Sequence, residues 1–353
     1  KAARCQVLRF PSQGAFFCLL IEAAKRSGSG RKKMENVLRL CSLGELVIKS
    51  GKKYNGKQGG QTMRTRIYNK CTDAEITDYL NRGGDTLFMS VGVTELHGQL
   101  PVDCESILAE AAALLMAEKA DGLAVINLPF FHAGATAIGR STVNISIKAG
   151  YDYLKTVVYA FYKLGFKRIF FLSMHGPAYL TINSVCMDFF HETQNPICHL
   201  ELGHVMDIAK ENGWVCGEDR METFTDLMYG AYKVMNQLEF VPILSDFDRE
   251  AFLAKRKEGN VKQGFKKDLH KLNFSTGGFG SYYAELEEHG GLEYSMTEQE
   301  REQRGEKGQK LLQEMVEKFD PLHFSTLLQE LDQAVNEEIV PRYPHLNLDK
   351  PYK

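Results

Sequence analysis

The sequence lacks a Cys-x-x-Cys pair, and its cysteines show no metal-binding or redox spacing. Eight cysteines are scattered over positions 5, 18, 41, 71, 104, 186, 198 and 216. This scatter argues against a zinc ribbon and against a thioredoxin-like site. In a chain of 353 residues, such cysteine usage favours a reducing, cytoplasmic location.

The sequence also lacks a long hydrophobic run and an excess of charge of one sign. The longest early apolar run, from Ala15 to Ile21, is far shorter than the roughly 20 residues of a membrane-spanning helix. It has no cleavage pattern of a signal peptide. The 43 basic and 45 acidic residues are mixed along the chain and give a net charge of −2, so no basic footprint for nucleic acid is present. We therefore expect neither a membrane nor a nucleic acid to be a partner.

The two ends of the chain differ in composition from the middle. The first 33 residues close on a Ser-, Gly- and Lys-rich stretch before Met34, so we expect Met34 to be the natural start, with a genuine N-terminal arm as the alternative. Residues 51–62 are rich in glycine and polar side chains and predict an exposed loop. We predict a partly disordered N-terminal extension and loop over residues 1–65, a main domain over 66–320, and a helical tail over 321–353.

Helix and strand patterns alternate from residue 72 onwards. A capping-box signature at Thr72 opens a helix through Leu80, and the apolar run from Asp85 to Val93 predicts a buried parallel strand. The pattern continues with helices near 106–119 and 151–164 and strands near 123–128 and 168–173. Further helices follow over 296–318 and 324–336, with Pro321 separating them. This alternation predicts an α/β fold with three α/β/α layers and a mainly parallel central sheet.

Two of the predicted strands end on candidate metal ligands. The first runs into Glu95 and His97, whose side chains lie on the same side of an extended backbone. Another ends on His175, which is followed by a glycine as His97 is. Ligands bind beyond the carboxyl ends of parallel strands. Carboxylates and neutral imidazoles together suit zinc, manganese or iron(II) better than calcium.

The segment around His97 resembles the creatininase (creatinine amidohydrolase) family. Residues 94–111 read Thr-Glu-Leu-His-Gly-Gln-Leu-Pro-Val-Asp-Cys-Glu-Ser-Ile-Leu-Ala-Glu-Ala. Family members carry a Glu-x-His-Gly segment, a Leu-Pro step, an acidic ligand and a helix here. This chain is one residue shorter before the Leu-Pro step. Alignment on Leu100-Pro101 and on residues 109–111 puts Glu105 in the place of the family's bridging aspartate, and Asp103 remains the competing candidate.

Two further segments extend the resemblance. Residues 164–176 are similar to the family's strand that closes on a metal-binding histidine, which gives that place to His175. Pro177 and Ala178 stand where the family has Gly-Asn, so we expect different substrate contacts in this loop. Residues 217–223 resemble an acidic stretch of the family, with Glu222 as the matching glutamate and Glu218 as the alternative. The resemblance covers roughly residues 70–320, including a glycine-rich stretch at 277–280.

The resemblance implies a metal-dependent hydrolase of the creatininase family that acts on a small polar molecule. It implies two divalent ions, Zn, Mn or Fe, held by Glu95, His97, Glu105 and His175. A metal-activated hydroxide would then attack a carbonyl group. The candidates for delivering a proton to the leaving group are Glu222 and His132. The resemblance also implies a homo-oligomer such as a hexamer.

Three functions stay open at this point. The leading hypothesis is hydrolysis of a non-peptide C–N bond in a cyclic amide or a formamide, the reaction that dominates the resembled family. The second is ring-opening hydrolysis of a cyclic ketone such as an oxidised inositol, with the same metal site. The third is an inactive binding or assembly subunit, against which the retention of all four ligand positions argues.

Overall fold

The computed structural model describes residues 63–217, 220–252, 254 and 294–343. The chain divides into the units Lys1–Thr62 and Met63–Lys353, and the described fold belongs to the second. Several sequence predictions lie outside the described residues: the extension over residues 1–33, the loop over 51–62, Glu218, the glycine-rich stretch at 277–280 and the last part of the tail.

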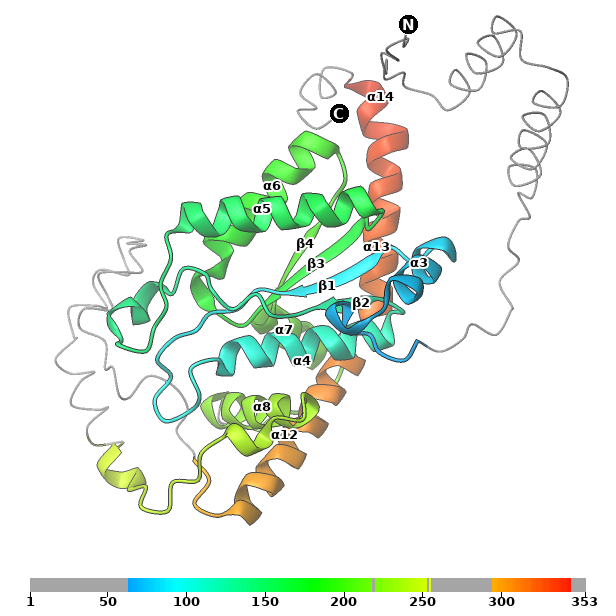
Figure 1. Cartoon of the computed structure of the whole chain (residues 1–353). Helices are drawn as coiled ribbons and strands as arrows, with labels where there is room; N and C mark the ends of the chain where they lie inside the picture. Colours follow the sequence, from blue (N-terminus) through cyan, green and yellow to red (C-terminus); the bar gives the residue numbers. More distant parts are fainter. Residues whose placement is uncertain (1–62, 218–219, 253, 255–293, 344–353) are drawn as a thin grey trace, which may run out of the picture. The chain divides into compact units, whose positions relative to one another are not determined.

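A parallel sheet of four strands forms the centre of the described fold (Figure 1). Its strands are β1 (Thr86–Ser90), β2 (Leu123–Val125), β3 (Arg168–Ser173) and β4 (Cys198–Glu201), in the order β2-β1-β3-β4. Phe88 at the middle of β1 pairs with Ala124 on one side and with Phe170 on the other. All residues of β1 are buried, as expected for a central parallel strand. The predicted α/β fold with a parallel sheet is confirmed.

Helices cover both faces of this sheet. The helices of the described chain are η1 (Tyr68–Lys70), α3 (Asp73–Asn81), α4 (Cys104–Lys119), η2 (Gly134–Ile138), α5 (Ile147–Leu164), η3 (Gly176–Ala178), α6 (Tyr179–Thr193), α7 (Leu202–Glu211), α8 (Arg220–Val234), η4 (Leu238–Phe240), α12 (Glu298–Phe319), α13 (Pro321–Ala334), η5 (Val335–Ile339) and α14 (Val340–Arg342). None of the helices in the described part of the chain is long and apolar enough to span a membrane.

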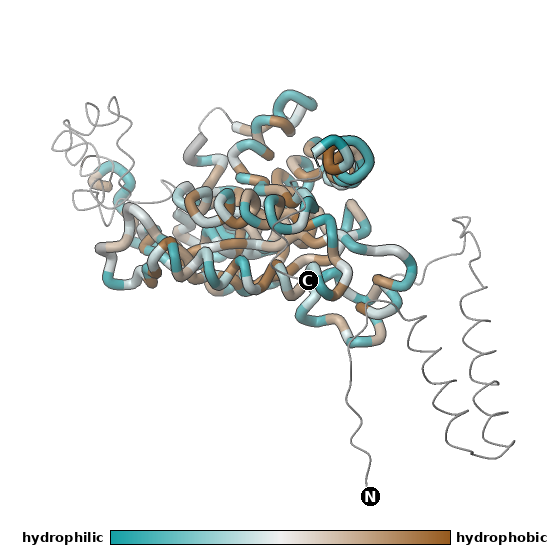
Figure 2. The backbone as a smooth tube through the Cα atoms, turned by 90° about the horizontal axis from the view of Figure 1, so that it is seen from above, coloured by the Kyte–Doolittle hydropathy of each residue, from teal (hydrophilic) through white to brown (hydrophobic). Residues whose placement is uncertain are grey.

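The strand side chains divide the core into two halves. Leu87, Met89 and Phe171 point into a core that α3, α5 and α6 close. Phe88 and Phe170 point into the opposite core, which α4 and α7 close and which α8 and α12 extend as a further layer (Figure 1). Hydrophobic residues accordingly run along the interior of the fold, and hydrophilic residues gather on the outer sides of the helices (Figure 2). This alternation follows from the period of two in an extended chain.

Capping residues and a proline explain where several helices begin and end. The Thr72 hydroxyl accepts from the Glu75 backbone N–H, and the Glu75 carboxylate accepts from the Thr72 N–H at 2.7 Å, which confirms the predicted capping box. Asp320 has a φ of 55° and ends α12. Pro321 is the first residue of α13 rather than part of a gap between helices, because a missing N–H costs nothing at that position.

A glycine contact joins α8 to α12. A Cβ atom on Gly308 would lie 1.7 Å from the backbone oxygen of Asp226, and one on Gly230 would lie 2.0 Å from the carbonyl carbon of Gly308. Beside this contact the Asp226 side chain, 1% exposed, pairs with Arg304 at 2.7 Å and with Lys307 at 2.6 Å. The two helices therefore pack backbone against backbone and hold the layer behind α4.

We predict that Gly308→Ala lowers the free energy of unfolding by about 1–2 kcal/mol. The added methyl group overlaps the α8 backbone, and this overpacking outweighs the roughly 1 kcal/mol that alanine gains over glycine in a helix. Denaturant unfolding followed by circular dichroism measures the change. Gly203→Ala in α7 is the matched control, because its Cβ would meet its nearest neighbour at an ordinary 3.5 Å. Unchanged stability of the Gly308 variant would contradict the close packing.

Candidate metal centre

Two carboxylates and an imidazole converge just beyond the carboxyl end of β1. Glu95 and His97 follow the strand, and Glu105 stands in the first turn of α4. One potential ligand atom from each of the three lies within 4.8 Å of the other two. Glu95 is 2% exposed and His97 is 5% exposed, and the Glu105 side chain is 14% exposed. Buried carboxylates are costly unless a positive charge or hydrogen bonds compensate them.

His175, which follows β3, completes the cluster from a neighbouring strand. Its Nδ1 lies 3.1 Å from Oε1 of Glu95 and 3.0 Å from Oε2 of Glu105. Its Nε2 lies 2.9 Å from the backbone oxygen of His132. A carbonyl oxygen only accepts, so Nε2 carries the hydrogen of this bond. Nδ1 is therefore the nitrogen that faces both carboxylates.

The site needs a positive charge between its carboxylates. Burial by itself would lower the pKa of His175, but its hydrogen bonds to Glu105 and Glu95 outweigh burial and raise that pKa. Burial raises the pKa of Glu95. Burial opposes ionisation of Glu105 as well, but the hydrogen bond from His175 lowers its pKa. A proton on His175 Nδ1 would place a positive charge between the two carboxylates.

This donor set fits a divalent metal ion. A cation can replace the proton on His175 Nδ1, since the same nitrogen and the same carboxylate oxygens then become ligands. Burial lowers the pKa of His97, which favours the neutral imidazole that metals bind. The Nε2–H of His175 donates to a backbone carbonyl, as the second nitrogen of a metal-binding histidine commonly does.

Backbone hydrogen bonds fix the segment that carries Glu95 and His97. The Glu95 N–H donates to the Val102 carbonyl at 2.8 Å. The Leu96 N–H donates to the Thr142 hydroxyl at 3.0 Å. These contacts tie the segment to Val102 and to Thr142.

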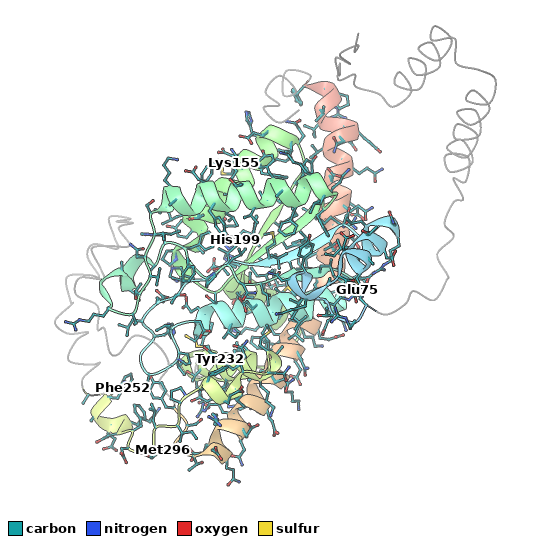
Figure 3. The ribbon with its side chains drawn as sticks, viewed as in Figure 1. Glu75, Lys155, His199, Tyr232, Phe252 and Met296 are labelled. Carbon is teal, nitrogen blue, oxygen red and sulfur yellow. The ribbon has the colours of Figure 1, made fainter. Side chains whose placement is uncertain are left out.

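Asp103 and Glu105 point to different neighbours. Asp103 precedes α4, and its carboxylate accepts a hydrogen bond from the hydroxyl of Tyr232. Figure 3 labels Tyr232 on α8. Glu105 lies two residues later and contacts His175. The geometry groups Glu105 with the other candidate ligands and joins Asp103 to the neighbouring helix.

The two predicted proton donors lie in different surroundings. His132 adjoins the cluster through its backbone carbonyl, and Nδ1 of its imidazole lies 3.4 Å from the Ile145 carbonyl oxygen. Glu222 is an exposed residue of α8 and pairs with Lys307 of α12 at 3.3 Å. Of the two, His132 contacts the candidate ligand His175 through its backbone carbonyl, and Glu222 pairs with Lys307 of α12.

One contact residue was not predicted from the sequence. The Thr136 hydroxyl donates a hydrogen bond to Oε2 of Glu95. Thr136 stands in η2, in the connection after β2, where a single threonine carries no sequence signal. Only the parallel order of β2, β1 and β3 brings this connection over the strand ends.

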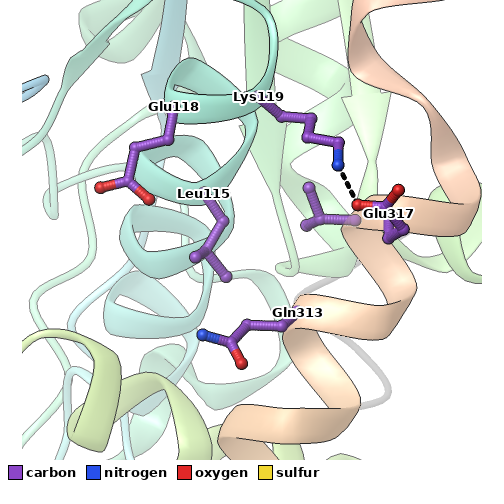
Figure 4. Close-up of a pocket in the computed structure, with 6 residues that line it drawn as sticks. Leu115, Glu118, Lys119, Gln313 and Glu317 are labelled. Carbon is purple, nitrogen blue, oxygen red and sulfur yellow. Dashed lines mark hydrogen bonds and ion pairs between the residues drawn. The ribbon is translucent and has the colours of Figure 1, made fainter. Parts of the chain in front are cut away.

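A shallow groove lies elsewhere, between α4 and α12 (Figure 4). An ion pair between Lys119 and Glu317 crosses it. Its lining residues are Leu115, Glu118, Lys119, Gln313, Val316 and Glu317. The groove contains none of the candidate ligands, which lie at the strand ends.

Comparison with known proteins agrees with this fold. Residues 69–233 match the model of the family described as creatininase, creatinine amidohydrolase. No curated protein matches the chain. A tryptophan-to-alanine mutant of creatininase has 14% sequence identity and a TM-score of 0.50, covering 76% of this chain and 99% of that chain. At this level of identity, the likeness shows a shared fold.

Two other solved structures are described with their metals. A manganese creatininase has 14% identity and a TM-score of 0.49, covering 76% of this chain and 98% of that chain. A glutamate-to-glutamine mutant of creatininase of Zn–Zn type has 13% identity and a TM-score of 0.48, with the same coverage of 76% and 98%.

We predict that Glu105→Gln loses at least one bound divalent ion. Glutamine keeps the size of the side chain but removes the negative charge that holds cations close together. Metal analysis of protein loaded with Zn²⁺ or Mn²⁺ measures the stoichiometry.

Asp103→Asn is the matched control, because the asparagine side-chain oxygen can still accept a hydrogen bond from the Tyr232 hydroxyl. We expect it to weaken metal binding by no more than about 10- to 100-fold, the range for residues outside the ligand shell. The reverse pattern, with metal lost from the Asp103 variant alone, would make Asp103 the bridging ligand.

Proposed function

We propose that the chain is a metal-dependent hydrolase of a non-peptide C–N bond. The premise is that the chain belongs to the creatininase family, a family of hydrolases, by its match over residues 69–233. The substrate class we propose is a small polar cyclic amide or formamide. One observation carries the proposal: Glu95, His97 and Glu105 offer ligand atoms within 4.8 Å of one another, beside Nδ1 of His175. A cluster of this kind at strand ends is where ligands bind in parallel sheets.

Four residues would hold the metal: Glu95, His97, Glu105 and His175. We propose two divalent ions, for which zinc, manganese and iron(II) suit the mixed carboxylate and imidazole donors. Such ions lower the pKa of a coordinated water and polarise a carbonyl oxygen. The low exposure of the site would strengthen these electrostatic effects.

The protein's own residues have separate tasks in this proposal. The backbone carbonyl of His132 fixes the orientation of the His175 ring. Delivery of a proton to the leaving nitrogen is proposed for His132 or Glu222. The backbone carbonyl of His132 contacts His175, whereas Glu222 would have to exchange its ion pair with Lys307 for the substrate. His132 is therefore the first of the two to test.

A second candidate function keeps the metal and changes the bond. Pro177 stands in the loop after His175, and a Cβ atom on Gly134 would lie 2.5 Å from Pro177 Cγ. Pro177 and Ala178 stand where the family has Gly-Asn, and this replacement is compatible with a different substrate. The candidate is ring-opening hydrolysis of a cyclic ketone such as an oxidised inositol. The non-catalytic alternative is an inactive binding or assembly subunit.

Three further properties stay proposals that depend on the family resemblance and on composition. They are a small-molecule substrate without nucleic-acid or membrane partners, a homo-oligomeric assembly such as a hexamer, and a cytoplasmic location.

We predict that metal-loaded wild-type protein hydrolyses a cyclic amide in a panel of cyclic amides, formamides and cyclic ketones. Release of the ring-opened product, measured by mass spectrometry, identifies the bond. Selective opening of cyclic ketones would establish the second candidate instead. A protein that binds no metal and converts no compound would contradict the proposal and favour the non-catalytic subunit.

We predict that His97→Ala and His175→Ala each lose metal and turnover but stay folded. Ligands beyond the strand ends contribute little to the hydrophobic core, so cooperative unfolding should persist. Metal analysis and thermal unfolding are measured on the same samples. Loss of the cooperative transition in both variants would instead assign these histidines a structural role.

A further inference from the structure

One short connection reaches two candidate ligands that come from different strands. Residues 132–136 follow β2, and two of their polar contacts reach candidate ligands. The His132 carbonyl accepts from Nε2 of His175, which follows β3. The Thr136 hydroxyl donates to Oε2 of Glu95, which follows β1. The connection after β2 thus contacts both a residue that follows β1 and a residue that follows β3.

The two oxygens of Glu95 have separate partners. Oε1 lies 3.1 Å from His175 Nδ1 and faces the cluster. Oε2 accepts from Thr136, and Thr136 is 5% exposed, so water does not readily replace this donor. The Thr136 hydroxyl also lies 3.2 Å from the Ala133 carbonyl, but an ionised carboxylate is the stronger acceptor. With Oε2 held, the carboxylate plane is fixed and Oε1 stays aimed at the cluster.

The connection itself is held in place by close contacts. Gly134 has a φ of 60°, a conformation that glycine adopts without strain. A Cβ atom there would lie 2.5 Å from Pro177 Cγ, so the connection packs directly on the loop after His175. The Ala133 N–H donates to Oδ1 of Asn144 at 2.9 Å. Thr136 is therefore presented to Glu95 by a braced segment of the fold.

We propose that Thr136 is a positioning residue of the metal centre, whose hydroxyl orients Glu95 so that Oε1 faces the bound cation. The inference rests on the proposed metal-dependent function. Thr136 touches no reacting atom and acts through Glu95. Residues of this kind, which hold the ligands rather than the ion, typically change metal affinity by 10- to 100-fold.

Metal titration of apoprotein variants tests the proposal. Competition with a chromophoric chelator gives the dissociation constants of Zn²⁺ and Mn²⁺, and thermal unfolding of the apoprotein is followed in parallel. Thr136→Val has the same shape without the hydroxyl, and we expect it to weaken binding by about 10- to 100-fold. Thr136→Ser keeps the hydroxyl and should restore an affinity within about threefold of wild type. If the valine variant does not fold, Thr136→Ala replaces it.

Thr86→Val is the matched control. Thr86 is buried at the opposite end of β1 and accepts a hydrogen bond from Arg168 Nε at 2.9 Å. We expect the valine substitution to lower the melting temperature and leave metal affinity unchanged. Thr136→Val with wild-type affinity, or the same affinity loss in both valine variants, would overturn the positioning role. Wild-type protein that takes up neither metal would overturn the proposed function and this inference with it.

Discussion

The arrangement of the candidate centre depends on two carboxylates that share one imidazole nitrogen. Glu95 and Glu105 approach His175 Nδ1 at 3.1 Å and 3.0 Å in a site largely closed to water. Two carboxylates this close repel each other, and burial removes the water that would screen them. A cation between them relieves this repulsion, either the proton on His175 or a metal ion in its place. The surrounding structure keeps these groups from separating.

Three parts of the fold contribute to that constraint. The parallel order places the ends of β1 and β3 side by side, which brings Glu95 next to His175. The first turn of α4 supplies Glu105, where the positive end of the helix dipole favours an anion. The layer of α8 and α12 holds α4 from behind, and the Tyr232 hydroxyl binds Asp103 just before that helix. The connection after β2 closes the remaining side through Thr136 and His132.

Much of this centre could be predicted from the sequence because its signals are local. A capping box, buried apolar runs and polar residues at their ends indicated β1, β3 and the positions of Glu95, His97 and His175. The helix predicted over 106–119 begins at Cys104, which puts Glu105 inside its first turn rather than before it. The contact between Glu105 and His175 joins residues 70 positions apart, and no spacing rule reports such a contact.

Other features could not be predicted because their signals are weak or non-local. β4 is an edge strand of four half-buried residues, too short for a clear periodic pattern. Thr136 has no distinguishing neighbour in sequence, and its contact with Glu95 depends on how the connection after β2 packs on Pro177. Glu222 matched an acidic segment of the family by resemblance, but its described partner is Lys307 on α12. Side-chain direction decides such cases, and it follows from tertiary packing.

An anomalous difference map from crystals of the Zn²⁺-loaded protein tests directly whether the four residues bind a metal ion. We expect a peak among Glu95, His97, Glu105 and His175. The His175 ligand atom should be Nδ1, at about 2.0–2.2 Å from the ion, while Nε2 stays bonded to the His132 carbonyl. A peak at Nε2, or no peak among these four residues in crystals that contain zinc elsewhere, would contradict it.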